Sequence, residues 1–497
     1  MQCTAAAREG GRKMTFNSWE FLLFYPIVCA LYFLLPKRAR WPMLLLASYF
    51  FYMCYQAELV FLIFGTTLIS FVASKIIERS EKRSTKKAWL AITLVVCFGV
   101  LFFYKYFNFL SGSVFGLIEL FGGKPTRFEL DLMLPVGISF YTFQTLSYVI
   151  DVYRGDVKTE DNFFFYALFV SFFPQLVAGP IERPGNLIPQ LREPHAPTKE
   201  NFVKGAKHMM VGFFKKVCVA DLISVYVNAV YNSPESANAL GVIIATVLFA
   251  VQIYCDFSGY TDIAIGCARI MGIRLMQNFD HPYVATSIKE FWARWHISLS
   301  SWFKDYLYIP LGGNRCSKAR HLMNVMIVFL VSGLWHGAAW TFVIWGAIHG
   351  LYQIIGTLTI KGRNALLERI GIAKDSRIVI IARRIMTFIL VCFAWLFFRA
   401  NSMADAMSLL RTLFVGWGST GETLSLMGLS TAGIITTVLS ILTLIKLDRM
   451  LTYDDSPDGS DALTANGAFI YFVWIIAFAF GLLLSKDMMS TFIYFQF

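Results

Sequence analysis

Apolar segments long enough to cross a lipid bilayer recur along the whole chain. A helix of about 20 apolar residues spans the roughly 30 Å of hydrocarbon in a membrane. Of the 497 residues, 57% are hydrophobic and only 15% are charged, whereas soluble domains carry about 25% charged residues. So few charges cannot cover a water-facing surface. The sequence therefore excludes a soluble enzyme and predicts an all-α polytopic membrane protein.

The predicted organisation is a polar N-terminal extension (1–13), a membrane domain (14–484) and a C-terminal tail (485–497). The clearest spans are expected at 19–35, 41–57, 59–74, 88–104, 322–340, 341–359, 378–397, 430–446 and 468–484. Pro and Gly interrupt the stretch 105–310, where the candidate spans are 133–150, 163–178, 209–231 and 239–255. Interrupted helices are tolerated at membrane depth only beside protein or a wet cavity. We therefore expect a cavity in this stretch.

The basic character of the chain reports orientation in the membrane. The chain carries 44 Lys and Arg against 32 Asp and Glu, a net charge of +12, and these cations gather at the ends of apolar segments. Cytoplasmic loops are enriched in Lys and Arg, so the basic loops mark the inner face and the C-terminal tail is expected outside. Contact with lipids is implied, and no nucleic-acid motif is visible. The nine cysteines show no paired spacing and are interpreted as small buried hydrophobes.

Polar side chains inside apolar runs are functional candidates, because each is costly to bury in a membrane. The densest group comprises Asp256, Ser258, Tyr260, Thr261 and Asp262, followed by Arg269 and Arg274. Two compatible interpretations stay open. The group is either an ion-pair network that joins two helices or the polar wall of an aqueous cavity.

A tryptophan stripe follows at helical spacing, comprising Trp292, Trp295 and Trp302. This pattern predicts one helix within 287–313 that lies in the membrane interface with its indoles at headgroup level. His296 neighbours the stripe and is either a hydrogen-bonded structural residue or part of a site.

His336 is placed 15 residues into an apolar helix that is expected to begin at 322, roughly 22 Å from the inner end. Small residues surround it, which indicates either close helix packing or room for a substrate. A buried neutral imidazole is a suitable general base near physiological pH. His349, near the end of the next span, is expected to be a structural partner. The histidines lack the HxxxH spacing of a zinc site, so no metal is expected.

Two long strings, FWARWHISLSSWFKDYLYIPLGG and SGLWHGAAWTFVIWGAIHG, resemble the signature of the membrane-bound O-acyltransferase family. LPVGISFYTFQTLSYVIDVYRG, FFPQLVAGPIERPGNLIPQL, DFSGYTDIAIGCARIMGI and NFDHPY are similar to its bacterial branch. That branch includes alginate O-acetylation proteins and, more distantly, D-alanyl-lipoteichoic acid transferases. The resemblance implies a ring of about 9–12 transmembrane helices, with re-entrant and interfacial helices, around a central funnel.

The same resemblance implies an activity and a set of site residues. His336 would be the catalytic residue and His296 the second one. The substrate cavity would be lined by Asp256, Ser258, Tyr260, Asn278, Trp302 and Trp335. The acyl group, acetyl in preference to D-alanyl, would pass from a cytoplasmic thioester to a hydroxyl of a cell-surface polysaccharide. The donor would be acetyl-CoA or an acyl carrier protein, with no permanently bound cofactor.

The implied setting is the inner (cytoplasmic) membrane, with an extracytoplasmic partner acyltransferase of the SGNH-hydrolase type. The C-terminal FIYFQF resembles a tyrosine motif in which Tyr494 takes the acyl group transiently. An aromatic membrane anchor is the alternative for this tail. D-alanyl transfer to teichoic acid is the alternative reaction. A transporter or flippase for a lipid-linked or acylated sugar is the alternative from another class.

Overall fold

The structure is a computed structural model that describes residues 14–55, 57–448, 451 and 492. The predicted extension 1–13, the predicted span 468–484 and Tyr494 lie outside these residues. The chain divides into two units, the first made of residues up to 209 with 261–276, the second of 210–260 and everything from 277 onward. Helices make up most of the described residues of both units; turns, irregular segments and a β-bridge between Phe279 and Trp295 connect them. The predicted all-α class is confirmed.

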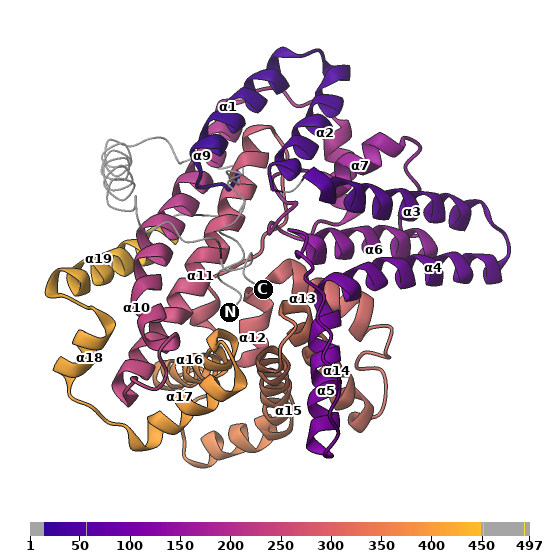
Figure 1. Cartoon of the computed structure of the whole chain (residues 1–497). Coiled ribbons are helices and arrows are strands. Elements are labelled where there is room, and N and C mark those ends of the chain that lie inside the picture. The colour runs from indigo at the N-terminus through magenta and orange to yellow at the C-terminus, as the bar shows by residue number, and fades with distance from the viewer. Residues whose placement is uncertain (1–13, 56, 449–450, 452–491, 493–497) are drawn as a thin grey trace. The chain divides into compact units, whose positions relative to one another are not determined.

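The first unit is built from helices that follow one another closely in sequence. They are α1 (Trp19–Leu34), α2 (Lys37–Met53), η2 (Ala57–Leu59), α3 (Val60–Arg79), α4 (Arg83–Leu101), η3 (Phe102–Tyr106), α5 (Phe107–Leu120), α6 (Ile138–Arg154), α7 (Phe163–Ser171), α8 (Pro184–Arg192) and α9 (Lys199–Phe213). The last residues of α9 belong to the second unit. Helices α3, α4 and α6 lie side by side in the first unit (Figure 1).

Two predicted spans of the first unit differ from the helices observed. The candidate 163–178 yields only the nine-residue α7, which ends at Ser171. Pro174 disfavours the helical conformation of the residue before it, so the chain turns there. The span predicted at 41–57 is shifted, because α2 begins at Lys37 directly after Pro36. Lys37, Arg38 and Arg40, which fall between the predicted spans 19–35 and 41–57, therefore lie in the first turn of α2.

The second unit contains the sequence groups that carry the candidate site. Its helices are η4 (Phe214–Asp221), α10 (Leu222–Tyr231), α11 (Ala239–Ile270), η5 (Pro282–Val284), α12 (Ile288–Arg294), α13 (Ile297–Phe303), η6 (Lys304–Tyr308), α14 (Lys318–His336), α15 (Trp340–Arg369), α16 (Arg377–Arg399), α17 (Met403–Val415), α18 (Thr420–Met427) and α19 (Thr431–Asp448). The end of α11, from residue 261, belongs to the first unit. Serine side chains cap several helix starts; Ser317, for example, accepts a hydrogen bond from the backbone N–H of Arg320 at 3.3 Å, which satisfies a donor that the helix leaves unpaired.

The helices of the described residues fit a membrane protein in length and in surface. Six of the helical segments are long and apolar enough to cross a bilayer, and they run over Ala57–Arg79, Arg83–Leu120, Ala239–Ile270, Trp340–Arg369, Arg377–Arg399 and Thr431–Asp448. On α16, Ile378, Ile385 and Ile389 are 77%, 56% and 55% exposed. A row of exposed branched apolar side chains is unfavourable in water and suits contact with lipid.

Helices α14 and α15 form a hairpin in which the two backbones touch. A Cβ atom added to Gly333 would lie 2.3 Å from the carbonyl oxygen of Phe342, and one added to Gly346 would lie 2.3 Å from that of Phe329. No side chain fits at that distance. Small residues at helix contacts allow this close packing, which drives helix association in membranes. The glycines therefore set the spacing of the hairpin that ends at His336.

Replacing Gly346 with Ala should lower the stability of the purified protein. The added methyl group must push α14 away from α15, and overpacking of this kind costs about 1–3 kcal/mol. Gly356→Ala is the matched control on the same helix, since a Cβ there has nothing within 4 Å, and Ala favours a helix over Gly. The check is the thermal unfolding midpoint in detergent. Equal midpoints for both variants would contradict the close packing described above.

Candidate active site

His336 is the last residue of α14 and is 4% exposed. The prediction that the helix continues to 340 is wrong, because Gly337 is extended (φ −162°, ψ 149°) and α15 starts only at Trp340. A Cβ on Gly337 would lie 2.1 Å from the Phe342 ring, so this tight turn requires glycine. Helix α14 starts at Lys318, and His336 lies about 27 Å along it. The imidazole thus lies at the closed end of a helical hairpin.

Aromatic rings from three helices surround the His336 imidazole. Its ring centroid lies 5.0 Å from that of Trp335 on α14, 5.0 Å from Trp345 on α15 and 5.5 Å from Phe398 on α16. Each of these rings meets the imidazole edge-on. Trp335, predicted to line the cavity, also contacts the ring of His296 at 5.8 Å. The site around His336 is therefore an aromatic enclosure that limits access of water.

His296 occupies a break between two short helices. The single helix predicted for this region is wrong, because α12 ends at Arg294, Trp295 is extended, and His296 adopts the left-handed conformation (φ 46°, ψ 53°). Left-handed backbone is uncommon outside glycine and costs about 1–3 kcal/mol, so it persists only where surrounding structure holds it. The helical spacing of the tryptophans could not reveal this break.

The segment 278–280 supplies the contacts that hold the break. Phe279 pairs antiparallel with Trp295. The Asp280 N–H donates to the Arg294 carbonyl at 2.9 Å, and the Ile297 N–H donates to the Asn278 carbonyl at 2.9 Å. These two bonds lie on either side of Trp295 and His296. The pairing therefore fixes the backbone of both residues.

Asn278 adds a side-chain contact to this pairing. Its Oδ1 accepts hydrogen bonds from the N–H of Ser298 at 3.2 Å and from the Ser298 hydroxyl at 2.9 Å, and both residues are fully buried. The first bond satisfies a backbone donor at the start of α13. The structure thus gives Asn278 a role in positioning the residues around His296. That Asn278 lines the substrate cavity stays a prediction.

The structure brings the two candidate histidines together. The ring centroids of His296 and His336 are 6.3 Å apart, and both side chains are buried. Phe257 of α11 also packs against His296, with centroids 4.6 Å apart. Burial lowers the pKa of His296 from its ordinary value to about 3, so its imidazole is neutral at physiological pH. A neutral imidazole can accept a proton or hydrogen-bond a reacting group.

The tryptophan stripe packs in the protein interior instead of at headgroup level. Trp292, Trp295 and Trp302 are 8%, 1% and 5% exposed. Trp292 donates its indole N–H to Nδ1 of His349 at 3.2 Å, which places the His349 proton on Nε2 and fits the expected structural role. Trp302 packs on Tyr306 with centroids 5.0 Å apart, and its place in the cavity stays a prediction.

Asp256, the first residue of the polar group at 256–262, belongs to a buried ion-pair network, which was one of the two interpretations of that group. Lys216 of η4 bonds Asp256 at 2.7 Å and Asp221 at 2.9 Å, and all three side chains are buried. Lys216 was not among the predicted site residues, although it lies inside the candidate span 209–231. Ser258 Oγ is buried with no hydrogen-bond partner among the described residues, so it stays a candidate for the cavity.

Other members of the group belong to the first unit and have partners there. In the first unit, Asp262 faces His208 at 3.9 Å and Arg269 faces Glu200 at 3.6 Å. Arg274 donates its backbone N–H to Gln190 Oε1 at 2.8 Å. Within the described ranges, no group of three or more His, Cys, Asp or Glu is arranged to hold a metal ion.

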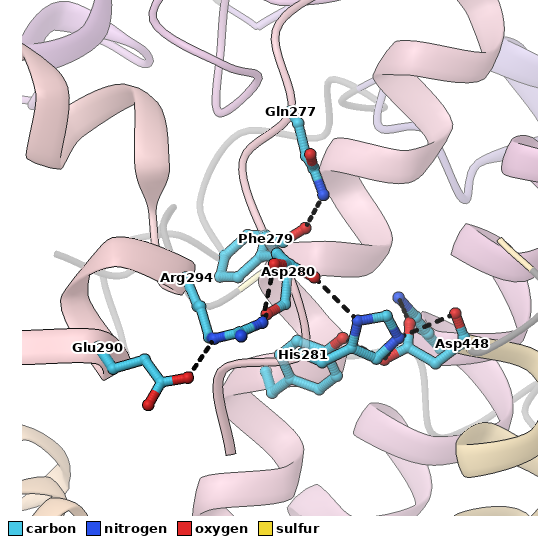
Figure 2. A network of polar contacts seen from close by, with 9 residues as sticks. Gln277, Phe279, Asp280, His281, Glu290, Arg294 and Asp448 are labelled. Atoms are coloured by element: carbon cyan, nitrogen blue, oxygen red, sulfur yellow. Dashed lines mark hydrogen bonds and ion pairs between the residues drawn. The ribbon is translucent and has the colours of Figure 1, made fainter. Parts of the chain in front are cut away.

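A second polar network holds the segment that pairs with Trp295 (Figure 2). Arg294 bonds Asp280 at 2.8 Å and Glu290 at 3.1 Å. His281 Nδ1 lies 3.1 Å from Asp280 Oδ1, and its Nε2 lies 3.2 Å from the carbonyl oxygen of Asp448, at the end of α19. His281 is itself left-handed (φ 45°). The segment is thus anchored to α12 on one side and to α19 on the other.

Asp448 gathers further partners at the end of α19. Its carboxylate bonds Lys215 at 2.7 Å and accepts a hydrogen bond from the Tyr254 hydroxyl. Sequence reasoning missed Asp280, Arg294 and Asp448 as supports of the site. The NFDHPY string, which carries the resemblance, was the available signal for Asp280.

The helices and the buried histidine pair define a multi-pass membrane protein with an enclosed centre suited to proton transfer. The family model of the membrane-bound O-acyltransferases matches residues 156–402. The probable alginate O-acetylase AlgI of Pseudomonas aeruginosa is 38% identical over 81% of this chain and 75% of its own length. That of Pseudomonas putida is 35% identical over 97% of this chain and its full length.

The peptidoglycan O-acetyltransferase of Helicobacter pylori is 33% identical over 80% of this chain and 79% of its own length. The chain belongs to the membrane-bound O-acyltransferase family. It is an O-acyltransferase, and this membership favours the enzyme over the transporter alternative.

Replacing Asn278 with Ala should reduce both stability and the rate of acyl transfer. The substitution leaves the buried N–H and hydroxyl of Ser298 without their acceptor, which costs about 1–3 kcal/mol, and it loosens the backbone around His296. Ser298→Ala is the graded comparison, since it removes only the hydroxyl bond and should have a smaller effect. The measurements are the unfolding midpoint and the transfer rate. Wild-type values for both in the Asn278 variant would exclude the positioning role.

Proposed function

We propose that the protein moves an acetyl group from a cytoplasmic thioester to hydroxyl groups of a cell-surface polysaccharide, in the cytoplasmic membrane. The observation that carries the proposal is the pair of buried histidines with rings 6.3 Å apart at the closed end of the α14–α15 hairpin. The similar proteins named for alginate and peptidoglycan O-acetylation support acetyl as the acyl group and a polysaccharide as the acceptor.

In the proposed reaction, His336 is the general base. It takes the proton of the acceptor hydroxyl while that oxygen attacks the thioester carbonyl carbon. The tetrahedral intermediate collapses with cleavage of the C–S bond, and the departing thiolate takes the proton back from the imidazolium. An ester and a free thiol result. His336 ends α14, and a helix C-terminus favours a positive charge, which assists the transient imidazolium.

His296 has an assisting role in this proposal. Its neutral imidazole lies beside His336 and can orient the acceptor hydroxyl or hydrogen-bond the reacting carbonyl group. The aromatic rings around His336 limit entry of water, so the activated acyl group is protected from hydrolysis. Holding the two reactants in one small enclosure also supplies the entropic part of the acceleration.

Tyr494 is the proposed first acceptor, in the tail expected outside the membrane. A phenol has a pKa near 10, lower than that of a sugar hydroxyl, so its ester is a better acyl donor than a sugar ester. The phenol ester would pass its acyl group to the polysaccharide through an extracytoplasmic partner of the SGNH-hydrolase type. Acetyl-CoA and an acyl carrier protein are both suitable thioester donors.

Replacing His336 with Ala should abolish acylation while the protein still inserts into the membrane. Loss of a general base costs about 100- to 10,000-fold in rate. His321→Gln is a matched control, because His321 contacts Tyr308 away from the histidine pair. Acylation of the polysaccharide in cells and label transfer from acetyl-CoA in vitro are the measurements. Normal transfer by the His336 variant would overturn the mechanism.

Incubation of the purified protein with labelled acetyl-CoA should place label on Tyr494, located by intact and peptide mass. Tyr494→Phe removes only the oxygen, so the variant should take no label and should fail to acetylate the polysaccharide. A labelled D-alanyl carrier protein, tested in parallel, distinguishes the alternative reaction. If polysaccharide acetylation is unchanged in the Phe variant, the tail is an anchor and not an acceptor.

A further inference from the structure

Phe492 is buried in the second unit, against Tyr260 and against Lys216 of the ion-pair network. It is 1% exposed. Its ring meets the ring of Tyr260 edge-on, with centroids 4.9 Å apart, and the ammonium group of Lys216 lies 4.3 Å from its centroid. Both contacts are specific for an aromatic side chain, since they use the positive edge and the negative face of π systems.

The two side chains that contact Phe492, Lys216 and Tyr260, are themselves held in place by the protein. Lys216 is held by Asp256 at 2.7 Å and by Asp221 at 2.9 Å, so its ammonium group has a defined position. Tyr260 is 1% exposed and lies one turn after Asp256 on α11. We call the surface formed by Lys216 and Tyr260 the aromatic seat. A cation held in place and desolvated attracts a ring more strongly than a solvated one.

The aromatic seat lies one helical turn from the candidate active site. Tyr260 follows Phe257 by three residues on α11, and residues at this spacing lie on the same helix face. Phe257 packs against His296 at 4.6 Å, and His296 lies 6.3 Å from His336. Ring contacts therefore join Phe492 to Tyr260 and Phe257 to His296, and one turn of α11 connects the two contacts.

We propose that the aromatic seat docks the C-terminal tail of the same chain through Phe492 and so brings Tyr494 to the active site. Two residues of chain span at most about 7 Å, so the tether keeps the phenol close to the seat. The proposal rests on the proposed function of Tyr494 and makes Phe492 its positioning residue. Docking in cis raises the effective concentration of the phenol without any further partner.

A photo-crosslinking experiment tests the docking without reference to activity. Benzoylphenylalanine is introduced at position 492 in the full-length protein, and the crosslinked peptides are identified by mass spectrometry after irradiation in membranes. Crosslinks to η4 or to α11 around Tyr260 are expected. Crosslinks to lipid alone would overturn the proposal and favour the membrane-anchor interpretation.

A labelling experiment tests the consequence for acyl transfer. With labelled acetyl-CoA, Phe492→Ala should take up label on Tyr494 at least roughly tenfold more slowly than wild type. The substitution removes both the ring contact with Tyr260 and the cation–π contact with Lys216, and their loss lowers the population of the docked tail by about that factor. Phe492→Leu keeps much of the apolar volume without the ring and should also be slow. Phe492→Trp restores a ring and should recover most of the rate.

The outcomes separate the docking from the underlying chemistry. A soluble peptide of sequence FIYFQF, supplied at high concentration, should be labelled by the Phe492→Ala protein, since the histidine pair is intact. Equal rates for wild type and Phe492→Ala would overturn the docking while leaving Tyr494 as acceptor. Absence of label from Tyr494 in the wild-type protein would instead reject the proposed acceptor itself.

Discussion

The ion pairs around Lys216 determine how the second unit can be built. A charged lysine is costly to bury, and removing one partner from a buried pair is strongly destabilising. Lys216 therefore ties η4 to α11 through Asp256, and its neighbour Lys215 ties η4 to the end of α19 through Asp448. Two adjacent cations on one short segment thus fix three elements. The surface that receives Phe492 exists because this arrangement is rigid.

The strained backbone at His296 depends on a second set of contacts. The short pairing of 278–280 with 294–297 holds a conformation that a histidine seldom adopts. Asp280 and Arg294 then bond each other, and Asn278 holds the start of α13. The strain is local and its supports are distributed over α12, α13 and α19. Because the backbone of His296 is held in this one conformation, its imidazole has one favoured orientation, whereas a continuous helix would permit several.

The sequence predicted most of the helices, because apolar length is a local signal, and it singled out His296 and His336, whose rings the structure brings together. The break at His296 escaped prediction, since the tryptophan spacing favours a helix and only pairing with Phe279, 16 residues earlier in the chain, overrides it. The end of α14 at His336 depends on the close contact of Gly337 with the Phe342 ring, a packing contact that apolar length does not reveal. Lys216 was overlooked because a lysine in an apolar run has meaning only once its carboxylate partners are known.

The surroundings of His336 bear on how an acyl group can be transferred without being lost to water. In the proposed reaction the thioester is activated toward any nucleophile, so the enzyme has to favour an alcohol over water, which has a similar reactivity and a far higher concentration. Trp335, Trp345 and Phe398 enclose the imidazole with apolar rings, and a dry enclosure strengthens electrostatic interactions while excluding water. The proposed acceptor in the tail of the same chain would have the advantage over solvent, because its local concentration is set by the chain.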